Sequence, residues 1–442
     1  MSATFDAVIV GSGPGGSTVA RELSRAGRRV LVLERGEDRR EGRLYGTYPG
    51  ALRYTARGGF LFTRDGMQVI RPQMVGGATG MYCGSAAGPP SWFRDRYGID
   101  LEPWVNQTIR ELGIRLLPPE LRGAASTRLA EAACDLGMEW KAQPKFMDPS
   151  RTSDGELRCG AHCMLGCRCG AKWNAGEYLD EAKELGCAVR TGTRVEVVQL
   201  EDGRAIGVRA KRGGRLEEFR GAVTILSAGG LGTAEILRAS GMSGAGEGLA
   251  MDATLMVYGA TRERGIGREP PMTWGWTDEE QGYMLSTLID PWLLYPAIMA
   301  VKGLREALTW SRWGRTLGVM VKIKDEVSGG IRDDGSIDKP MTEEDRLRLD
   351  RGIEAARRIL ERAGCDPGSL VVTPLRGTHP SATVRIGEML TPDLASAIPR
   401  LYVCDASVFP EALDAPTVLT IIALARRLSH HLLHGDLAPA PS

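Results

Sequence analysis

The hydrophobic pattern opens with a short apolar run at Phe5–Val10, a glycine-rich turn over residues 11–16, and an amphipathic stretch over residues 17–26. An apolar run, a tight turn and a helical period in this order predict a strand, a turn and a helix. A second apolar run over residues 30–33 predicts a buried parallel strand ending at Glu34. These segments together predict a β-α-β unit of the dinucleotide-binding kind.

The middle of the chain alternates turn residues with strand-like runs. Runs at residues 194–200, 205–210 and 223–226 predict further strands of the same domain. From about residue 253 the pattern changes to strand-like runs at 254–260, 283–289 and 317–324, separated by Pro- and Trp-rich stretches. This change predicts a second, substrate-facing domain.

A helix and a return to the first domain are predicted for the last part of the chain. Thr342 is followed three residues on by Asp345, as in a capping box, and the helical pattern runs to Ala363. Residues 398–433 predict a strand and a long helix. The predicted fold class is α/β, with a discontinuous Rossmann-like domain and a smaller α+β domain built on an antiparallel sheet. We expect the first domain to take residues 1–252 and 376–442, and the second to take residues 253–375.

Charge and length narrow the function classes. The chain has 56 Lys and Arg against 55 Asp and Glu and shows no basic run, so nucleic acid is not an expected partner. No apolar run reaches the roughly 20 residues of a membrane span. The first strand begins close to Met1 and leaves no room for a secretory signal peptide, so we expect a cytoplasmic protein.

The glycine-rich turn is a candidate cofactor site. Gly11, Gly13 and Gly16 let the backbone turn tightly and approach a pyrophosphate, whose charge the amide groups and the following helix would meet. Glu34 is placed to accept hydrogen bonds from ribose hydroxyls. The motif predicts an adenine dinucleotide, but it does not separate FAD from NAD.

Three further stretches resemble the signatures of the glucose-methanol-choline (GMC) family, and they lie in that family's order. Val75-Gly76-Gly77-Ala78-Thr79 resembles the first signature, a double-glycine loop. Ile225-Leu226-Ser227-Ala228-Gly229-Gly230 and the residues up to Gly241 are similar to the second. The strongest match is terminal, where His379-Pro380-Ser381 is followed by Asp405-Ala406-Ser407-Val408 and Pro416-Thr417.

The resemblance implies FAD as the cofactor and hydride abstraction from a CH–OH group. The family's catalytic base falls on His379, whose imidazole titrates near neutrality, and the aspartate that lies by the flavin falls on Asp405. The helix that starts near Thr417 should face the isoalloxazine. The residues expected to bind the cofactor are Gly11, Gly13, Pro14, Gly16, Glu34, Arg35, Gly76, Gly77, Thr79, Val195, Ala228, Asp405, Ala406 and Thr417.

The chain departs from the family pattern at two positions. Many members carry Asn or His immediately before the proline of the final motif, where this chain has Ala415, and Tyr82 stands where an Asn is common. Asp414 or Tyr82 would substitute for the missing partner, or the enzyme uses one base. The chain is also short for the family, which implies a trimmed substrate domain.

A cysteine-rich loop over residues 159–173 adds a second candidate site. Cys159, Cys163, Cys167 and Cys169 fall within eleven residues, and soft thiolates at this density suit an iron-sulfur cluster or zinc. The loop resembles one in a subset of GMC dehydrogenases and long-chain alcohol oxidases, in some of which a cluster relays electrons. A cluster here would send electrons to a protein or quinone rather than to oxygen. A disulfide or thiol-based structural loop remains the alternative.

Residues 283–313 are dense in Leu, Ile, Met, Trp and Tyr. They form either ordinary core or an apolar channel or lid that touches lipid. The second reading predicts an apolar alcohol as the substrate and admits peripheral contact with a membrane. Two other function classes stay open, namely a non-oxidative FAD enzyme such as a lyase, and a flavin electron-transfer subunit.

Overall fold

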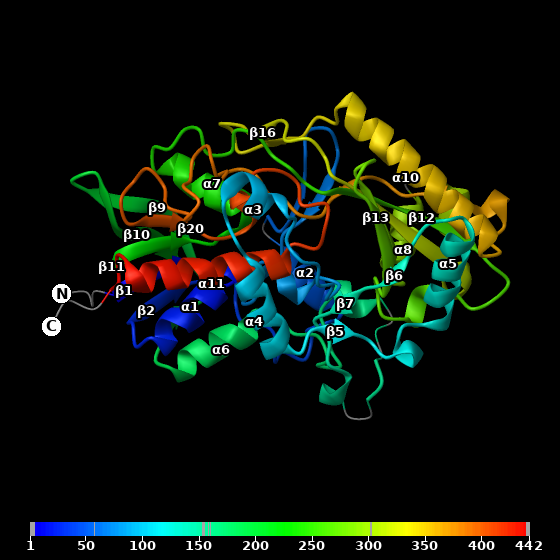
Figure 1. The fold of residues 1–442 in the computed structure, drawn as a ribbon, viewed down its shortest axis with the longest axis horizontal. Helices are drawn as coiled ribbons and strands as arrows, with labels where there is room; N and C mark the ends of the chain where they lie inside the picture. The colour runs from blue at the N-terminus through cyan, green and yellow to red at the C-terminus, as the bar shows by residue number, and fades with distance from the viewer. Residues whose placement is uncertain are drawn as a thin grey trace.

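The computed structural model describes residues 5–56, 58–152, 155–157, 159, 161–300 and 303–438. Two large sheets organise the described chain, and helices pack against both (Figure 1). This arrangement confirms the α/β class.

The first sheet carries the predicted β-α-β unit. Its strands are β1 (Phe5–Val10), β2 (Val30–Leu33), β8 (Ala188–Arg190), β9 (Thr193–Glu201), β10 (Arg204–Arg212), β11 (Arg215–Leu226) and β20 (Leu401–Val403), in the order β8-β2-β1-β11-β10-β9, with β20 beside β11. β1 is parallel to both β2 and β11, and β20 is parallel to β11. The chain therefore returns to its first sheet near its C-terminal end.

Helices α1 (Pro14–Arg25), α4 (Glu102–Leu112), α6 (Gly176–Glu184) and α11 (Val418–His434) pack together on one side of this sheet (Figure 1). Arg21 of α1 and Arg426 of α11 are both buried, and both pair with Glu111 of α4. Because a buried guanidinium is costly without a partner, this shared carboxylate holds the three helices together. Helix α7 (Gly229–Ala239) packs on β9.

The second sheet is mostly antiparallel. Its strands are β3 (Phe60–Phe62), β4 (Gln68–Ile70), β6 (Lys141–Ala142), β12 (Ala253–Ala260), β13 (Trp274–Asp278), β14 (Tyr283–Thr287), β15 (Thr316–Ile323), β18 (Val371–Val372) and β19 (Arg376–Gly377), in the order β3-β4-β19-β12-β15-β14-β13-β6, with β18 beside β12. Helices α5 (Ala124–Asp135) and α10 (Glu343–Arg362) cover it. The capping box predicted at the start of α10 is present, with both Thr342 and Asp345 bonded reciprocally.

Shorter elements complete the fold. They are α2 (Tyr48–Thr55), α3 (Trp92–Tyr97), α8 (Leu294–Ala300), α9 (Leu304–Ala307) and two strand pairs, β5 (Arg115–Leu116) with β7 (Pro144–Lys145) and β16 (Gly330–Ile331) with β17 (Ile337–Asp338). Among the described residues, no helix combines the length and the apolar character needed to cross a membrane.

The segment before β12 and the segment after β19 run together beside the first sheet. The amide of His379 donates to the carbonyl of Met251 at 2.9 Å, and the amide of Ser381 donates to the carbonyl of Ala250 at 2.8 Å. These bonds bring Asp252 next to His379, although 127 positions separate them in the sequence.

Candidate active site

One cleft of about 450 Å³ gathers most of the predicted site residues. The predicted residues that line it are Gly11, Gly13, Pro14, Glu34, Arg35, Gly77, Thr79, Val195, Ala228, Asp405, Ala406, Thr417 and His379. Its volume lies in the range of small-molecule and cofactor sites. Gly16 and Gly76 lie behind the lining, where they shape the turns. The candidate base and the dinucleotide motif therefore share one cavity.

Hydrogen bonds join the glycine-rich turn at residues 11–16, the end of β2 at residues 34–36 and the double-glycine loop at residues 76–77. Glu34 Oε2 accepts from the Ser12 amide at 3.0 Å and the Ser12 hydroxyl at 2.7 Å, and its Oε1 accepts from the Gly36 amide at 2.7 Å. The Gly76 amide donates to the Ser12 hydroxyl oxygen at 3.3 Å. A carboxylate has further lone pairs, so Glu34 is held at the strand end and still has acceptor capacity toward a ribose.

Glycine is required at different positions of the turn for different reasons, namely close packing at two of them and access to the cleft at a third. A Cβ on Gly16 would lie 2.1 Å from the Gly11 carbonyl oxygen, and one on Gly15 would lie 1.9 Å from the Cys404 carbonyl oxygen. These two positions allow α1 to pack closely against the first sheet. A Cβ on Gly13, in contrast, would meet no protein atom within 4 Å, because this residue faces the open cleft. The space above Gly13 suits a pyrophosphate that needs a close backbone approach.

Asp405 ties two walls of the cleft together. Its carboxylate accepts from the Gly229 amide at 2.8 Å, the Thr233 hydroxyl at 2.5 Å and the Ser407 amide at 2.8 Å. Burial raises the pKa of this carboxyl group against the effect of these donors. Asp405 thus fixes the loop before α7 relative to the loop before α11.

The N-terminus of α11 also opens on this cleft. Thr417, Val418 and Ile421 line it, and α11 begins at Val418. Its free amide groups and helix dipole present partial positive charge there.

His379 is oriented by a buried carboxylate. Its Nδ1 lies 2.7 Å from Asp252 Oδ2, and its side chain keeps 29% of its exposure while that of Asp252 keeps 1%. Lys322 lowers the pKa of Asp252 against the effect of burial, so this carboxylate is ionised and can only accept a hydrogen bond. The Nδ1 atom therefore carries the proton, and Nε2 carries the lone pair of a base.

Lys322 completes a buried charged group. Its Nζ lies 3.6 Å from Asp252 Oδ2 and 3.4 Å from His379 Nδ1. Burial lowers the pKa of His379 and Lys322 lowers it further, while Asp252 acts in the opposite direction. The imidazole is therefore neutral in the resting protein and available to take a proton.

The two candidate substitutes for the residue replaced by Ala415 lie in different surroundings. The Tyr82 hydroxyl donates to the Trp173 carbonyl at 2.9 Å, and Tyr82 does not line the cleft. Asp414 is buried, has a left-handed backbone with φ of 60°, and lies near Asp252, whose charge adds to burial in raising the pKa of Asp414 to about 7. Its Oδ1 has no hydrogen-bond partner among the described residues.

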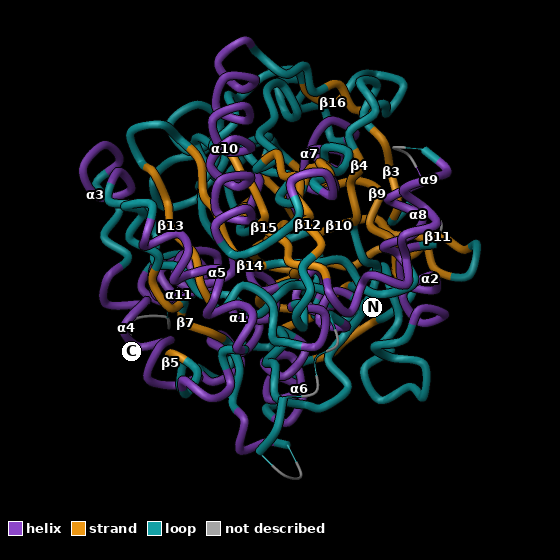
Figure 2. Tube along the Cα trace, turned by 90° about the vertical axis from the view of Figure 1, so that its right-hand side faces the viewer, coloured by secondary structure: helices purple, strands orange, loops and turns teal. Residues whose placement is uncertain are grey.

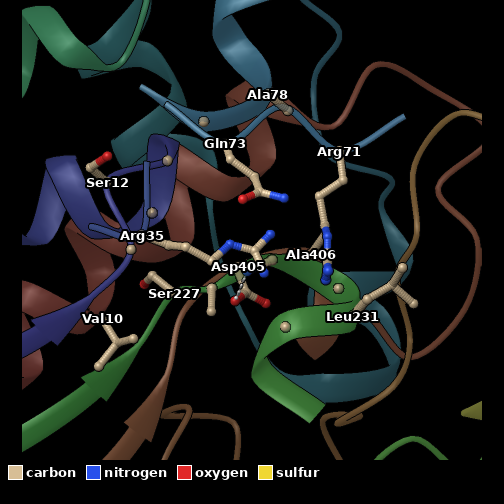
Figure 3. Close-up of a pocket in the computed structure, with 18 of the residues that line it drawn as sticks. Val10, Ser12, Arg35, Arg71, Gln73, Ala78, Ser227, Leu231, Asp405 and Ala406 are labelled. Atoms are coloured by element: carbon tan, nitrogen blue, oxygen red, sulfur yellow. Dashed lines mark hydrogen bonds between the residues drawn. The ribbon is translucent and has the colours of Figure 1, made fainter. Parts of the chain in front are cut away.

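Several residues at the site were not predicted from the sequence, among them two that support His379 from behind and two in the cleft lining. Asp252 and Lys322 support His379, while Arg71 and Gln73 reach the cleft from the segment after β4. Figure 3 shows the side chains of Arg35, Arg71 and Gln73 directed into the same space. The sequence could have indicated Lys322, because it is the one charged residue in a strand whose other residues are apolar, glycine or threonine. No local sequence pattern indicated Asp252, Arg71 or Gln73.

The cysteine loop does not support a four-thiolate centre. The thiols lie as two pairs, with Sγ–Sγ distances of 3.9 Å for Cys159 and Cys163 and 3.6 Å for Cys167 and Cys169. Within the part of the chain that the structure describes, no group of three or more His, Cys, Asp or Glu side chains is arranged to hold a metal ion. The predicted iron-sulfur ligation by these four residues is therefore not supported.

A buried lysine connects this loop to the double-glycine segment. Lys172 Nζ donates to the carbonyl oxygens of Tyr82 at 2.6 Å and Cys163 at 2.9 Å. The Ala175 amide donates to the Thr79 hydroxyl oxygen at 2.9 Å. The loop thus supports the cleft wall from behind.

The fold and the cleft define a dinucleotide-binding α/β protein. Residues 9–40 match an NAD(P)-binding Rossmann-like domain, residues 57–265 match the N-terminal part of the GMC oxidoreductase family, and residues 336–425 match its C-terminal part. The chain belongs to the GMC oxidoreductase family. This membership confirms the family predicted from the motifs and supports FAD as the cofactor.

Relatives extend over different shares of the chain. It is 26% identical over 437 residues to the uncharacterized protein MJ1450 of Methanocaldococcus jannaschii, covering 97% of this chain and 100% of that one. It is 28% identical over 401 residues to long-chain-alcohol oxidase FAO4B of Arabidopsis thaliana, covering 81% of this chain and 52% of that one. The fold is similar to that of pyridoxine 4-oxidase from Mesorbium loti, with a TM-score of 0.71 and 17% identity over 98% of this chain and 99% of that one.

Proposed function

We propose that this protein oxidises the CH–OH group of an apolar alcohol, with His379 as the base. The observation that carries this proposal is the position of His379, which lines the same cleft as the dinucleotide motif and has its Nδ1 2.7 Å from Asp252 Oδ2. When bound in this cleft, FAD supplies the hydride acceptor. The protein then needs only to hold the alcohol carbon in place and remove a proton.

In this proposal, Nε2 of His379 takes the hydroxyl proton of the alcohol. Asp252 stabilises the imidazolium that forms and keeps the ring in one tautomer. Lys322 keeps Asp252 ionised and prevents protonation of the imidazole before substrate arrives. The N-terminus of α11 presents partial positive charge to the cleft, and this charge favours negative charge on a cofactor bound there.

An apolar substrate is supported by two observations. The cleft lining includes Ile70, Leu231 and Ile236 together with the polar motif residues. The chain is also 28% identical to a plant protein named long-chain-alcohol oxidase. We propose oxygen as the electron acceptor, because this relative is named an oxidase.

Anaerobic mixing of the FAD-loaded protein with a series of straight-chain alcohols tests the proposal. Loss of the visible flavin absorbance that strengthens with chain length is the expected result. Absorbance that no alcohol changes would favour the alternatives, a lyase or an electron-transfer subunit. Asp252→Asn should retain FAD and reduce the rate of bleaching by about 10²- to 10⁴-fold, because the ring loses the carboxylate that orients it.

A further inference from the structure

The described surface carries a concentration of exposed apolar side chains that the cleft chemistry does not use. It is built from α2, the β3–β4 hairpin and the region of α8 and α9, and we call it the apolar face. Its most prominent residues are Leu52, Phe60, Phe62, Leu304, Leu308 and Trp310. Leu52, Leu304 and Leu308 keep 72%, 78% and 69% of their exposure, which is unusual for leucines of a folded chain.

The segments of the apolar face are connected to one another. The Leu293 amide donates to the Tyr48 hydroxyl oxygen at 2.9 Å, which joins the start of α8 to α2. The rings of Trp292 and Trp310 lie 5.3 Å apart. In Figure 2 α2, β3, β4, α8 and α9 gather at one edge of the molecule.

Residues 283–313 therefore contain both buried core residues and exposed apolar residues, the two alternatives that the sequence left open. Tyr283–Asp290, Tyr295 and Trp313 are buried core, and the Trp313 indole donates to the Asp290 carbonyl at 2.8 Å. The side chain of Asp290 is bound in turn by Arg376, which donates to both of its oxygens at 2.7 and 2.8 Å. The exposed leucines and tryptophans of this region thus project from a firmly anchored base.

Charge on the apolar face has one predominant sign. Arg53, Arg64, Arg305, Arg312 and Arg315 are all exposed, and none of them forms an ion pair within the described residues. Acidic side chains are scarce there, because residues 43–70 and 291–315 contain only Asp65 and Glu306 among Asp and Glu. An apolar surface with a basic rim matches a bilayer interface, whose acyl region accepts the apolar groups and whose anionic headgroups attract arginine.

The apolar face also reaches the mouth of the cleft. β4 and β19 pair in parallel, with Gln68 beside Arg376 and Val69 beside Gly377. The next residues of the two strands, Ile70 and Thr378, both line the cleft. Ile70 keeps 40% of its exposure and so belongs to the surface and the cleft together.

We propose that the apolar face docks the protein on an anionic phospholipid bilayer, with the mouth of the cleft turned toward the lipid. This docking goes beyond the proposed alcohol oxidation and does not depend on it. Leucines and aromatic rings enter the headgroup region, and the arginines contact the lipid phosphates. A lipophilic substrate then reaches the cleft without crossing water.

Sedimentation of the FAD-loaded protein with vesicles tests this docking without reference to activity. Vesicles of phosphatidylglycerol and phosphatidylcholine should carry the protein down, and vesicles of phosphatidylcholine alone should carry much less. Leu304→Ser with Leu308→Ser should weaken binding by about tenfold or more, given the apolar area that two leucines bury. Arg305→Glu with Arg312→Glu should weaken it by about fivefold or more per charge.

Leu200→Ser with Leu216→Ser is the matched control, since both leucines are exposed on the β9–β11 strands away from the apolar face. This control should bind anionic vesicles like the wild type. Wild-type protein that stays in solution, or an equal loss in the control, would overturn the proposal. A light-scattering mass that falls from dimer to monomer in Leu304→Ser with Leu308→Ser would also overturn it, because the face would then join two copies of the chain.

Discussion

His379 Nδ1 lies 2.7 Å from Asp252 Oδ2, so a partly exposed imidazole in the cleft is held by a carboxylate that is itself buried. The contact depends on two chain segments that run side by side, and Asp252 adopts a left-handed backbone with φ of 48° to make it. A strained non-glycine residue of this kind persists when its surroundings fix it. The geometry leaves Nε2 as the free nitrogen of the ring.

Lys322→Met should raise the pKa of His379, because the variant removes the cation that disfavours the imidazolium. A base works only when neutral, so activity is lost as the pH falls through this pKa. The acid limb of flavin reduction should therefore move to higher pH in the variant. The rate of anaerobic flavin reduction, measured against pH, checks this shift.

Lys324→Met is the control for this experiment, because Lys324 lies two residues further on and its side chain is 33% exposed beside Glu411. Its pH profile should match that of the wild type. An acid limb that stays in place in Lys322→Met, with FAD content preserved, would show that Lys322 does not act on His379.

Asp414→Asn should change how stability depends on pH. Burial raises the pKa of Asp414 to about 7 in the folded protein, so the folded state binds a proton that the unfolded state has released. Stability is therefore lost as the pH rises from the unfolded value, about 4, toward 7. The asparagine variant should be more stable than the wild type by about 1–4 kcal/mol at pH 8 and nearly equal to it at pH 4.

Urea unfolding at these two pH values measures the difference. Asparagine tolerates the left-handed backbone at this position, so the substitution introduces no new strain. The same stability difference at both pH values would contradict a raised pKa for Asp414.

Gly13→Leu should fold normally and lose FAD. A Cβ at this position meets no protein atom within 4 Å, so the new side chain fills cleft space rather than the core. Gly244→Leu is the control, because a Cβ there also meets nothing and the residue lies outside the cleft lining. The ratio of flavin to protein absorbance, with circular dichroism for folding, separates the two. FAD retained in Gly13→Leu would mean that the pyrophosphate does not pass over this glycine.

Much of the fold was predictable because its signals are local. The strands Phe5–Val10 and Val30–Leu33 and the capping box at Thr342 depend on neighbouring residues, and each appears as predicted. Helices α2 to α9 were not predicted. Short helices such as α3 carry little periodic signal, and tertiary packing decides them.

The same distinction between local and tertiary signals applies to the residues of the site. The glycine-rich turn and His379 belong to contiguous motifs, so the sequence identified them. Asp252 is 127 positions from His379, and only the pairing of residues 250–251 with 379–381 brings them together. The cysteines show the opposite case, because their close spacing in sequence predicted a metal centre, whereas no group of three or more ligands is arranged for a metal among the described residues.

Metal analysis tests the assignment of these cysteines. Protein purified without oxygen should contain no stoichiometric iron or acid-labile sulfide, and Cys163→Ser should leave FAD content unchanged. Reduced flavin should then reoxidise directly with oxygen. Stoichiometric iron and sulfide that Cys163→Ser abolishes would restore the cluster and the protein or quinone acceptor.

The most direct test of the central claim is the rate of anaerobic flavin reduction by a long-chain alcohol in His379→Ala. His434→Ala serves as the control, because His434 is exposed at the end of α11. Both variants should retain FAD. The control should bleach at the wild-type rate, and His379→Ala should bleach about 10²- to 10⁴-fold more slowly, the range for loss of a general base. Wild-type bleaching in FAD-loaded His379→Ala would contradict the assignment of His379 as the base.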